Sequence, residues 1–128
     1  MKHSGAGLVN NMFEDMRCVI TARLFREEKC FGPGIAELLE GIEELKSLRA
    51  AAMRMGMAYS KAWRIIHECE EKLGFRLLYS STGGRGGGGA EVTPEGKKLL
   101  SRFRTLEKEL NKTADTLLQA WREEDANL

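Results

Sequence analysis

The feature that most constrains the fold of this chain is a pair of helical patterns joined at one glycine, within residues 47–73. The first pattern is short, and Ser47 precedes it as a candidate helix N-cap. Gly56 then ends that helix, because glycine accepts the left-handed conformation that a tight turn requires. The second pattern covers residues 59–73, and Gly74 ends it in the same way. The sequence therefore predicts a helix-turn-helix, in which small residues let the helices cross and the second helix is exposed.

The second helix of this pair has an apolar face that is expected to meet the core. Its apolar positions, at helical spacing, are Ala62, Trp63, Ile66, Cys69 and Leu73. For Trp63, core packing is therefore favoured over contact with a nucleic-acid base. His67 lies one turn later and is predicted to be an ordinary surface or hydrogen-bonded residue without chemistry. The alternative for the whole pair is a plain helical hairpin with a solvated charged face.

Two further elements are expected before the helical pair. Residues 18–25 are rich in β-branched and apolar side chains, a polar turn follows, and residues 30–31 are apolar again. This order predicts a strand, a turn and a short strand, which the Gly32-Pro33-Gly34 run ends. Helical periodicity then follows in residues 35–45, with one apolar face made of Ile35, Leu38, Leu39, Ile42 and Leu45.

After the helical pair, residues 75–79 and 90–92 are predicted to form two paired strands. Six of the seven residues from 83 to 89 are glycine, and Arg85 is the exception. Such a segment between strands is typical of a wing that presents one arginine to a phosphate or to the minor groove. A nucleotide phosphate loop does not fit, because no Gly-Lys-Ser/Thr follows and the segment leads from strand to strand. A plain flexible linker remains as the alternative.

A long helix is predicted to close the chain, with Thr93 as its N-cap and Pro94 at its first position. About 28 residues at ~1.5 Å each give a length of about 40 Å, which exceeds what a small domain covers alone. A second copy of the chain is therefore expected to cover its apolar stripe, in either a parallel or an antiparallel pair. The alternative is two shorter helices folded back onto the first strands. The dimerisation candidates are Leu99, Phe103, Leu106, Leu110, Leu117 and Trp121.

The distribution of charge points to phosphates more clearly than the net charge of +1 does. Residues 37–45 carry four acids and no base, whereas residues 46–64 carry five bases and no acid. The exposed start of the second helix would meet base edges of DNA, because that end of a recognition helix enters the major groove. The base-reading candidates are Tyr59, Ser60, Lys61 and Arg64, and the phosphate-contact candidates are Lys46, Arg49 and Arg54, with Lys61 in either role.

Several other classes of protein are disfavoured. The three cysteines form no CxxC pair, which argues for free thiols and against a disulfide framework or a zinc site. With only two histidines, His3 and His67, no nucleophile constellation is present, so neither an enzyme nor a bound cofactor is expected. The sequence has no apolar run near the ~18 residues that span a membrane. Residues 1–11 lack the apolar region of a signal peptide, so a cytoplasmic protein without a membrane partner is expected.

Three segments of the chain resemble one known family. The runs at residues 56–63 (Gly-Met-Ala-Tyr-Ser-Lys-Ala-Trp), 82–90 and 92–96 (Val-Thr-Pro-Glu-Gly) are similar to the DNA-binding domain of the molybdate-responsive ModE regulators. They also resemble the wider LysR-type winged helix-turn-helix. The resemblance implies a winged-helix fold, a homodimer through the last helix, and binding to palindromic DNA. It also implies positions on the recognition helix for Ala58 to Lys61 and Arg64, and on the wing for Arg85.

Two departures from the family pattern matter. Many relatives cap the recognition helix with Ser or Thr where this chain has Ala58, and loss of such a cap costs ~1 kcal/mol. The chain also stops at Leu128, before the molybdate-binding domains of the family, so no molybdate site is expected in it.

Together these observations predict an α+β chain, mainly α, with an N-terminal β-hairpin, a winged helix-turn-helix and a long C-terminal dimerisation helix. The expected division is a tail at residues 1–14, a DNA-binding domain at 15–93 and the helix at 94–128. The expected function is that of a transcription regulator, and a protein-interaction module without DNA binding is the alternative. The candidate DNA-binding residues are Ser47, Arg49, Arg54, Ala58, Tyr59, Ser60, Lys61, Arg64 and Arg85.

Overall fold

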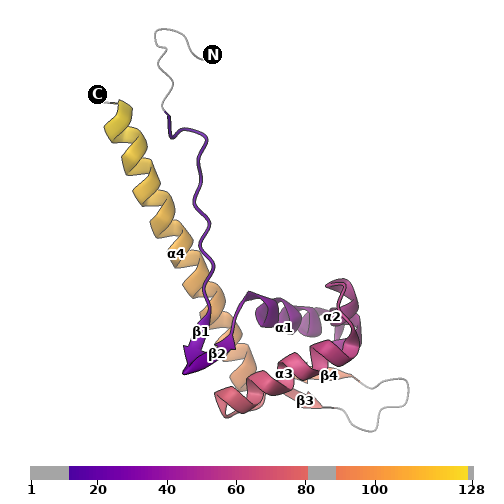
Figure 1. The fold of residues 1–128 in the computed structure, drawn as a ribbon. Helices are drawn as coiled ribbons and strands as arrows, with labels where there is room; N and C mark the ends of the chain where they lie inside the picture. Colours follow the sequence, from indigo (N-terminus) through magenta and orange to yellow (C-terminus); the bar gives the residue numbers. More distant parts are fainter. Residues whose placement is uncertain (1–11, 81–88, 127–128) are drawn as a thin grey trace. The chain divides into compact units, whose positions relative to one another are not determined.

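The computed structural model describes residues 12–80 and 89–126. Its internal contacts divide the chain into two units, Ala22–Thr105 and a second unit that joins Met1–Thr21 to Leu106–Leu128. The elements in chain order are β1 (Leu24–Arg26), β2 (Glu28–Phe31), α1 (Pro33–Leu45), α2 (Leu48–Arg54), α3 (Tyr59–Leu73), β3 (Leu78–Ser80), β4 (Ala90–Val92) and α4 (Pro94–Ala126), as Figure 1 shows. No described helix combines the length and the apolar character that crossing a membrane requires.

The first unit is a winged helix, which confirms the predicted fold class. Strands β1 and β2 form one antiparallel hairpin, and β3 and β4 form a second one after α3. The second hairpin pairs Leu78 with Val92 and Ser80 with Ala90, so the glycine-rich segment falls between its two strands in the sequence. That segment, residues 81–88, lies outside the described residues, and Arg85 with it.

The N-terminal hairpin is present but much shorter than predicted. A strand over residues 18–25 was expected, whereas regular pairing begins only at Leu24 and the turn is a single residue, Glu27, at φ 68°. Strand β2 has only four residues, and its observed partner is Leu24–Arg26. In the other unit, the backbone N–H of Ile20 donates instead to Asn111 Oδ1 at 2.9 Å, which satisfies it without a strand.

The core of the first unit lies where α1, α3 and α4 meet β2. Phe31 and Phe103 are fully buried there, in an edge-to-face contact with ring centroids 5.1 Å apart. Helices α1 and α2 approach closely because Gly41 has no side chain. A Cβ built at Gly41 would lie 2.9 Å from Cβ of Ala51. Leu45, predicted on the buried face of α1, is 41% exposed at the end of the helix.

The predicted caps and turns are confirmed. Ser47 Oγ accepts from the N–H of Ala50 at 3.0 Å, and Thr93 Oγ1 accepts from the N–H of Gly96 at 2.9 Å. Gly56 and Gly74 adopt φ values of +69° and +85°, which end α2 and α3 in the left-handed region.

One buried charge organises the end of α3, and sequence patterns did not indicate it. The carboxylate of Glu70 is only 8% exposed and accepts from the N–H groups of Leu77 and Leu78 at 2.7 and 3.1 Å. Arg76 lies 3.6 Å from the same carboxylate. Glu70 therefore attaches the start of the wing to the helix that precedes it.

The second unit is simpler. A turn at residues 12–15 and an irregular segment at residues 16–21 run beside the carboxyl-terminal half of α4 (Figure 1). Phe13 contacts Trp121 with ring centroids 5.7 Å apart, and Arg122 donates to the backbone oxygens of Phe13 and Met16. Helix α4 is continuous over 33 residues, so the alternative of two shorter helices is wrong.

Candidate nucleic-acid interface

The first turns of α3 present polar side chains to solvent. Tyr59 is 39% exposed, and Ser60, Lys61 and Arg64 are exposed as well. On the opposite side of the helix, the apolar residues at the predicted positions 62, 66, 69 and 73 are buried. The structure therefore brings the four predicted base-reading side chains together on the exposed side of one helix.

Helix α2 adds a cation beside the first residue of α3. The guanidinium of Arg49 lies over the ring of Tyr59, with Cζ 4.3 Å from the ring centroid. Such a contact contributes roughly 0.5–1 kcal/mol at an exposed site. It holds the exposed side chain of Arg49 beside the first residue of α3.

Two of the predicted DNA-binding arginines are engaged in exposed ion pairs. Arg54 Nη1 lies 2.7 Å from Glu44 Oε1, and Arg64 Nε lies 3.8 Å from Glu68 Oε2. All four side chains are at least 45% exposed, and pairs of this kind contribute ~0–1 kcal/mol. A phosphate can therefore replace the carboxylate at small cost. Lys61 has no ion-pair partner among the described residues.

The two cap positions of the helix pair differ. Ser47, predicted both as a cap and as a DNA-binding residue, uses its hydroxyl oxygen to cap α2. Ala58 is the N-cap of α3 and makes no side-chain cap hydrogen bond. The first N–H groups of α3 are thus left without the side-chain acceptor that a serine would supply.

The prediction that Trp63 packs in the core is wrong. Trp63 is 48% exposed and stacks on His67, with ring centroids 3.7 Å apart and ring planes 18° apart. Trp63 is exposed because of its position around the helix axis. Ala62 and Ile66 point into the core, and Trp63 is rotated by ~100° from Ala62. His67 Nδ1 also lies 2.8 Å from the carbonyl oxygen of Trp63, which agrees with the prediction of a hydrogen-bonded surface histidine.

The base of the wing is attached to the end of α1. Lys46 adopts the left-handed conformation after α1, and its carbonyl oxygen accepts from the N–H of Ala90 at 3.1 Å. The wing, α1 and the start of α2 are therefore held together at Lys46. No local sequence pattern predicts this contact.

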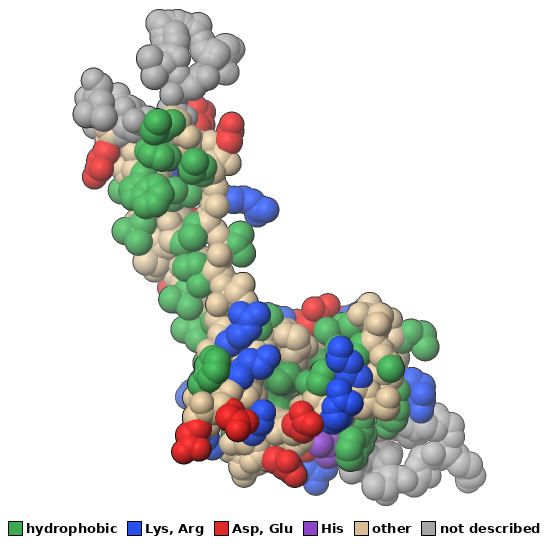
Figure 2. Space-filling model, in the orientation of Figure 1, with side chains coloured by type: hydrophobic (Ala, Val, Ile, Leu, Met, Phe, Trp, Pro, Cys, Tyr) green, Lys and Arg blue, Asp and Glu red, His purple; other side chains and the backbone are tan. Residues whose placement is uncertain are grey.

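The predicted dimerisation stripe on α4 divides into buried and exposed parts. Phe103 is 1% exposed in the core and is therefore not available to a second copy, whereas Leu99 is only partly buried against the same core. Leu106 and Leu110 are 38% and 36% exposed, and Leu117 and Trp121 are 59% and 52% exposed. Hydrophobic side chains gather along this part of α4 in Figure 2.

Comparison with known proteins finds a family model that is similar to the helix-turn-helix. Residues 36–97 match the family model described as "Bacterial regulatory helix-turn-helix protein, lysR family". The match covers α1 from Ala36 on, α2, α3, the wing strands and the first turn of α4.

Curated relatives match over a longer part of the chain. The molybdenum-pterin-binding protein MopB of Rhodobacter capsulatus is 32% identical over 94 residues, which are 73% of this chain and 35% of MopB. The DNA-binding transcriptional dual regulator ModE of Escherichia coli is 32% identical over 103 residues, which are 80% of this chain and 39% of ModE. The chain spans little more than a third of the length of these relatives.

Solved structures support the same fold. The chain is similar to the CbnR DNA-binding domain in a crystal structure with DNA, with a TM-score of 0.54, 23% identity, and coverage of 68% of this chain and 94% of that one. The BenM domain in complex with DNA at benA site 1 has a TM-score of 0.50 at 23% identity, and the match covers 68% of this chain and 92% of that one. With its winged-helix fold, the chain is similar over residues 36–97 to the bacterial LysR-type helix-turn-helix family, and its sequence is similar to that of ModE.

Proposed function

We propose that this chain is a transcription regulator that binds double-stranded DNA with the first turns of α3 in the major groove. The observation that carries the proposal is the exposed polar start of α3, with Arg49 of α2 held against Tyr59. Arginine and lysine donate to guanine O6 and N7, and serine accepts or donates. Arg64 and Lys61 are therefore the main candidates for reading bases.

Phosphate contacts are assigned to cations that flank this helix. Arg49 lies at the start of α2, Lys46 lies before it, and Arg54 lies at its end. Arg54 is in an exposed ion pair with Glu44, in which a phosphate can replace the carboxylate. The wing is expected to add Arg85, by its place in the sequence between β3 and β4. Each phosphate contact should steepen the loss of affinity with salt.

Homodimerisation through α4 completes the proposal. Leu110, Leu117 and Trp121 are large, apolar and at least 36% exposed on one element. Burial of such a side chain contributes up to ~1.5–3 kcal/mol, so an α4 pair that covers three from each copy has a substantial driving force. A two-fold dimer presents two copies of α3 and would therefore match a palindromic operator.

The test of base reading is a binding selection from a random DNA library, repeated with Arg64→Ala. We expect the variant to lose ~1–3 kcal/mol of discrimination at one position of the half-site while retaining non-specific affinity. Arg102→Ala, an exposed arginine on α4, is the matched control and should leave the selected sequence unchanged. No affinity for random duplex DNA at ~50 mM salt would contradict DNA binding and favour a protein-interaction module.

The test of the dimer is analytical ultracentrifugation at micromolar concentration. Leu117→Glu should shift the chain to monomer, because a carboxylate would be buried in the apolar interface. Gln119→Glu adds the same charge ~200° around the helix and should remain dimeric. A monomeric wild-type chain under these conditions would contradict the dimer.

A further inference from the structure

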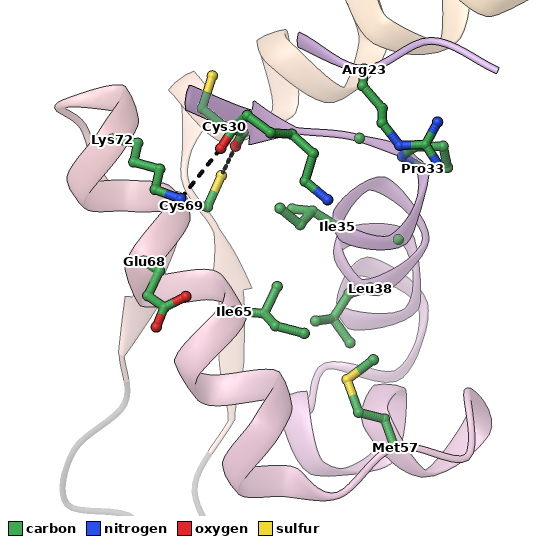
Figure 3. Close-up of a pocket in the computed structure, with 13 residues that line it drawn as sticks. Arg23, Cys30, Pro33, Ile35, Leu38, Met57, Ile65, Glu68, Cys69 and Lys72 are labelled. Atoms are coloured by element: carbon green, nitrogen blue, oxygen red, sulfur yellow. Dashed lines mark hydrogen bonds between the residues drawn. The ribbon is translucent and has the colours of Figure 1, made fainter. Parts of the chain in front are cut away.

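A cavity lies between α1 and α3, within the unit Ala22–Thr105. It has a volume of about 320 Å³ and is bounded by α1, α3 and β2 (Figure 3). This volume falls at the lower end of the range for small-molecule sites. Figure 3 shows that its inner part is apolar, with side chains of both helices facing one another across the space: Ile35 and Leu38 from α1, Ile65 from α3, and Met57 from the turn before α3.

The rim of this cavity carries more positive than negative charge. Lys72 and Glu68 line it but are already paired, with Glu28 at 3.4 Å and Arg64 at 3.8 Å respectively. Arg23 and Lys29 line it too, and within residues 12–80 and 89–126 neither has a carboxylate within ion-pair distance. Two cations therefore stand at the entrance to an apolar space without counter-charges.

The first turn of α1 adds hydrogen-bond donors at the same rim. Its N-cap, Gly32, offers no side-chain acceptor, and no acidic residue lies in the first turn. Gly32 and Gly34 both line the cavity, and a Cβ built at Gly34 would meet nothing within 4 Å. The backbone at this point is accessible to an approaching acceptor, which reinforces the positive rim.

The two cysteines in the wall do not oppose an anion. Cys69 donates its thiol hydrogen to the carbonyl oxygen of Cys30, with Sγ and O 2.6 Å apart. Burial raises the pKa of the Cys69 thiol to about 12, so this side chain is uncharged near neutral pH. The wall between the rim and the apolar floor is thus neutral.

We propose that this cavity binds a small organic anion with a short apolar tail. Its carboxylate lies against Arg23 and Lys29, and its tail lies between the apolar side chains of α1 and α3. The cavity volume of about 320 Å³ limits the ligand to a small molecule, so the tail is short. Because α3 forms one wall, the ligand contacts the same helix that carries the proposed base-reading side chains. The inference goes beyond DNA binding and does not depend on it.

The experiment is a titration of the full chain with hexanoate, followed by the amide shifts in ¹H–¹⁵N NMR spectra. We expect saturable shifts at Gly34, Ile65 and Cys69. Acetate has the head group without the tail and hexan-1-ol has the tail without the charge, so both should bind at least tenfold more weakly. Lys29→Gln should raise the hexanoate Kd at least fivefold, whereas Lys97→Gln, an exposed lysine on α4, should leave it unchanged.

Three results would overturn the proposal: shifts that do not saturate, equal binding of hexan-1-ol, or equal weakening by Lys97→Gln. Lys29 is exposed on a strand, so the amide spectrum of its variant without ligand should report an intact fold. Random duplex DNA is titrated into the same samples without hexanoate. Retained DNA binding with no hexanoate site overturns this inference alone, whereas hexanoate binding without DNA affinity contradicts only the proposed function.

Discussion

Ala58 occupies the N-cap position of α3, where a residue with a capping side chain is preferred. It precedes α3 in an extended conformation that suits a capping side chain, yet it supplies no acceptor. Ala58→Ser should therefore raise the free energy of unfolding by ~1 kcal/mol, measured by urea denaturation. The same substitution at Ala120, inside α4, has no free N–H to cap and should be neutral or slightly destabilising. Equal effects at the two positions would contradict the cap argument.

At the same scale, the residues that sequence patterns predicted correctly are those whose role is local. A serine before a helix or a glycine after one acts within four residues, so Ser47, Gly56 and Gly74 were recognisable without the fold. Trp63 and Glu70 were not, because their environments depend on residues that the fold brings near. Trp63 has the apolar side chain of a core residue, but its position around the helix axis points it away from the core. Glu70 cannot be told from a surface acid by sequence, and it is buried because the start of the wing packs against it.

At the scale of elements, the crossing of α1 and α2 depends on a missing side chain. A Cβ at Gly41 would come within 2.9 Å of Cβ of Ala51 and 3.2 Å of the Arg54 guanidinium. Gly41→Ala should force the helices apart and lower the free energy of unfolding by ~1–3 kcal/mol, despite the better helix propensity of alanine. Gly34→Ala lies on the same helix in open space and should be neutral or stabilising. Thermal unfolding of the two variants measures this difference in stability. A Gly41→Ala protein as stable as wild type would contradict the prediction.

Helices α1 and α4 are joined by a forked ion pair within the first unit. Arg104 donates to both oxygens of Glu40, at 2.7 and 2.6 Å, and this hydrogen bonding lowers the pKa of Glu40 below its ordinary value of 4.5. The pair therefore stabilises the fold above pH ~4.5, and the contribution is lost as the pH falls further and Glu40 becomes protonated. Both side chains are about a third exposed, so the effect should stay within ~1 kcal/mol.

The corresponding measurement is the free energy of unfolding of Glu40→Gln against wild type from pH 7 to pH 3. The difference should be present at pH 7 and vanish near pH 3. Glu37→Gln, on an exposed position of α1, should show no such pH-dependent difference. A constant deficit for Glu40→Gln across this range would mean that packing, rather than charge, joins the helices.

Elements differ in how well their limits could be predicted. The bounds of α3 were expected at residues 59–73 and are found there, because a glycine turn marks each end. The strand predicted over residues 18–25 is longer than the observed one, because apolar composition does not distinguish a strand from a segment packed along a helix. Phe103 shows the same limit on α4, where one apolar stripe continues from the core to the exposed half of the helix.

At the scale of the whole molecule, dimerisation should control which DNA is bound. If α4 pairs two copies, a duplex with two half-sites gains the second contact within one complex, and its affinity exceeds that of a single half-site. Leu117→Glu should therefore lose most of the affinity for a palindromic duplex while a single half-site is bound as before, since α3 is untouched. Fluorescence anisotropy with both duplexes at one fixed salt concentration measures this. Gln119→Glu should behave as wild type. An equal loss of affinity for both duplexes would instead show that the α4 substitution disturbs the helix-turn-helix itself.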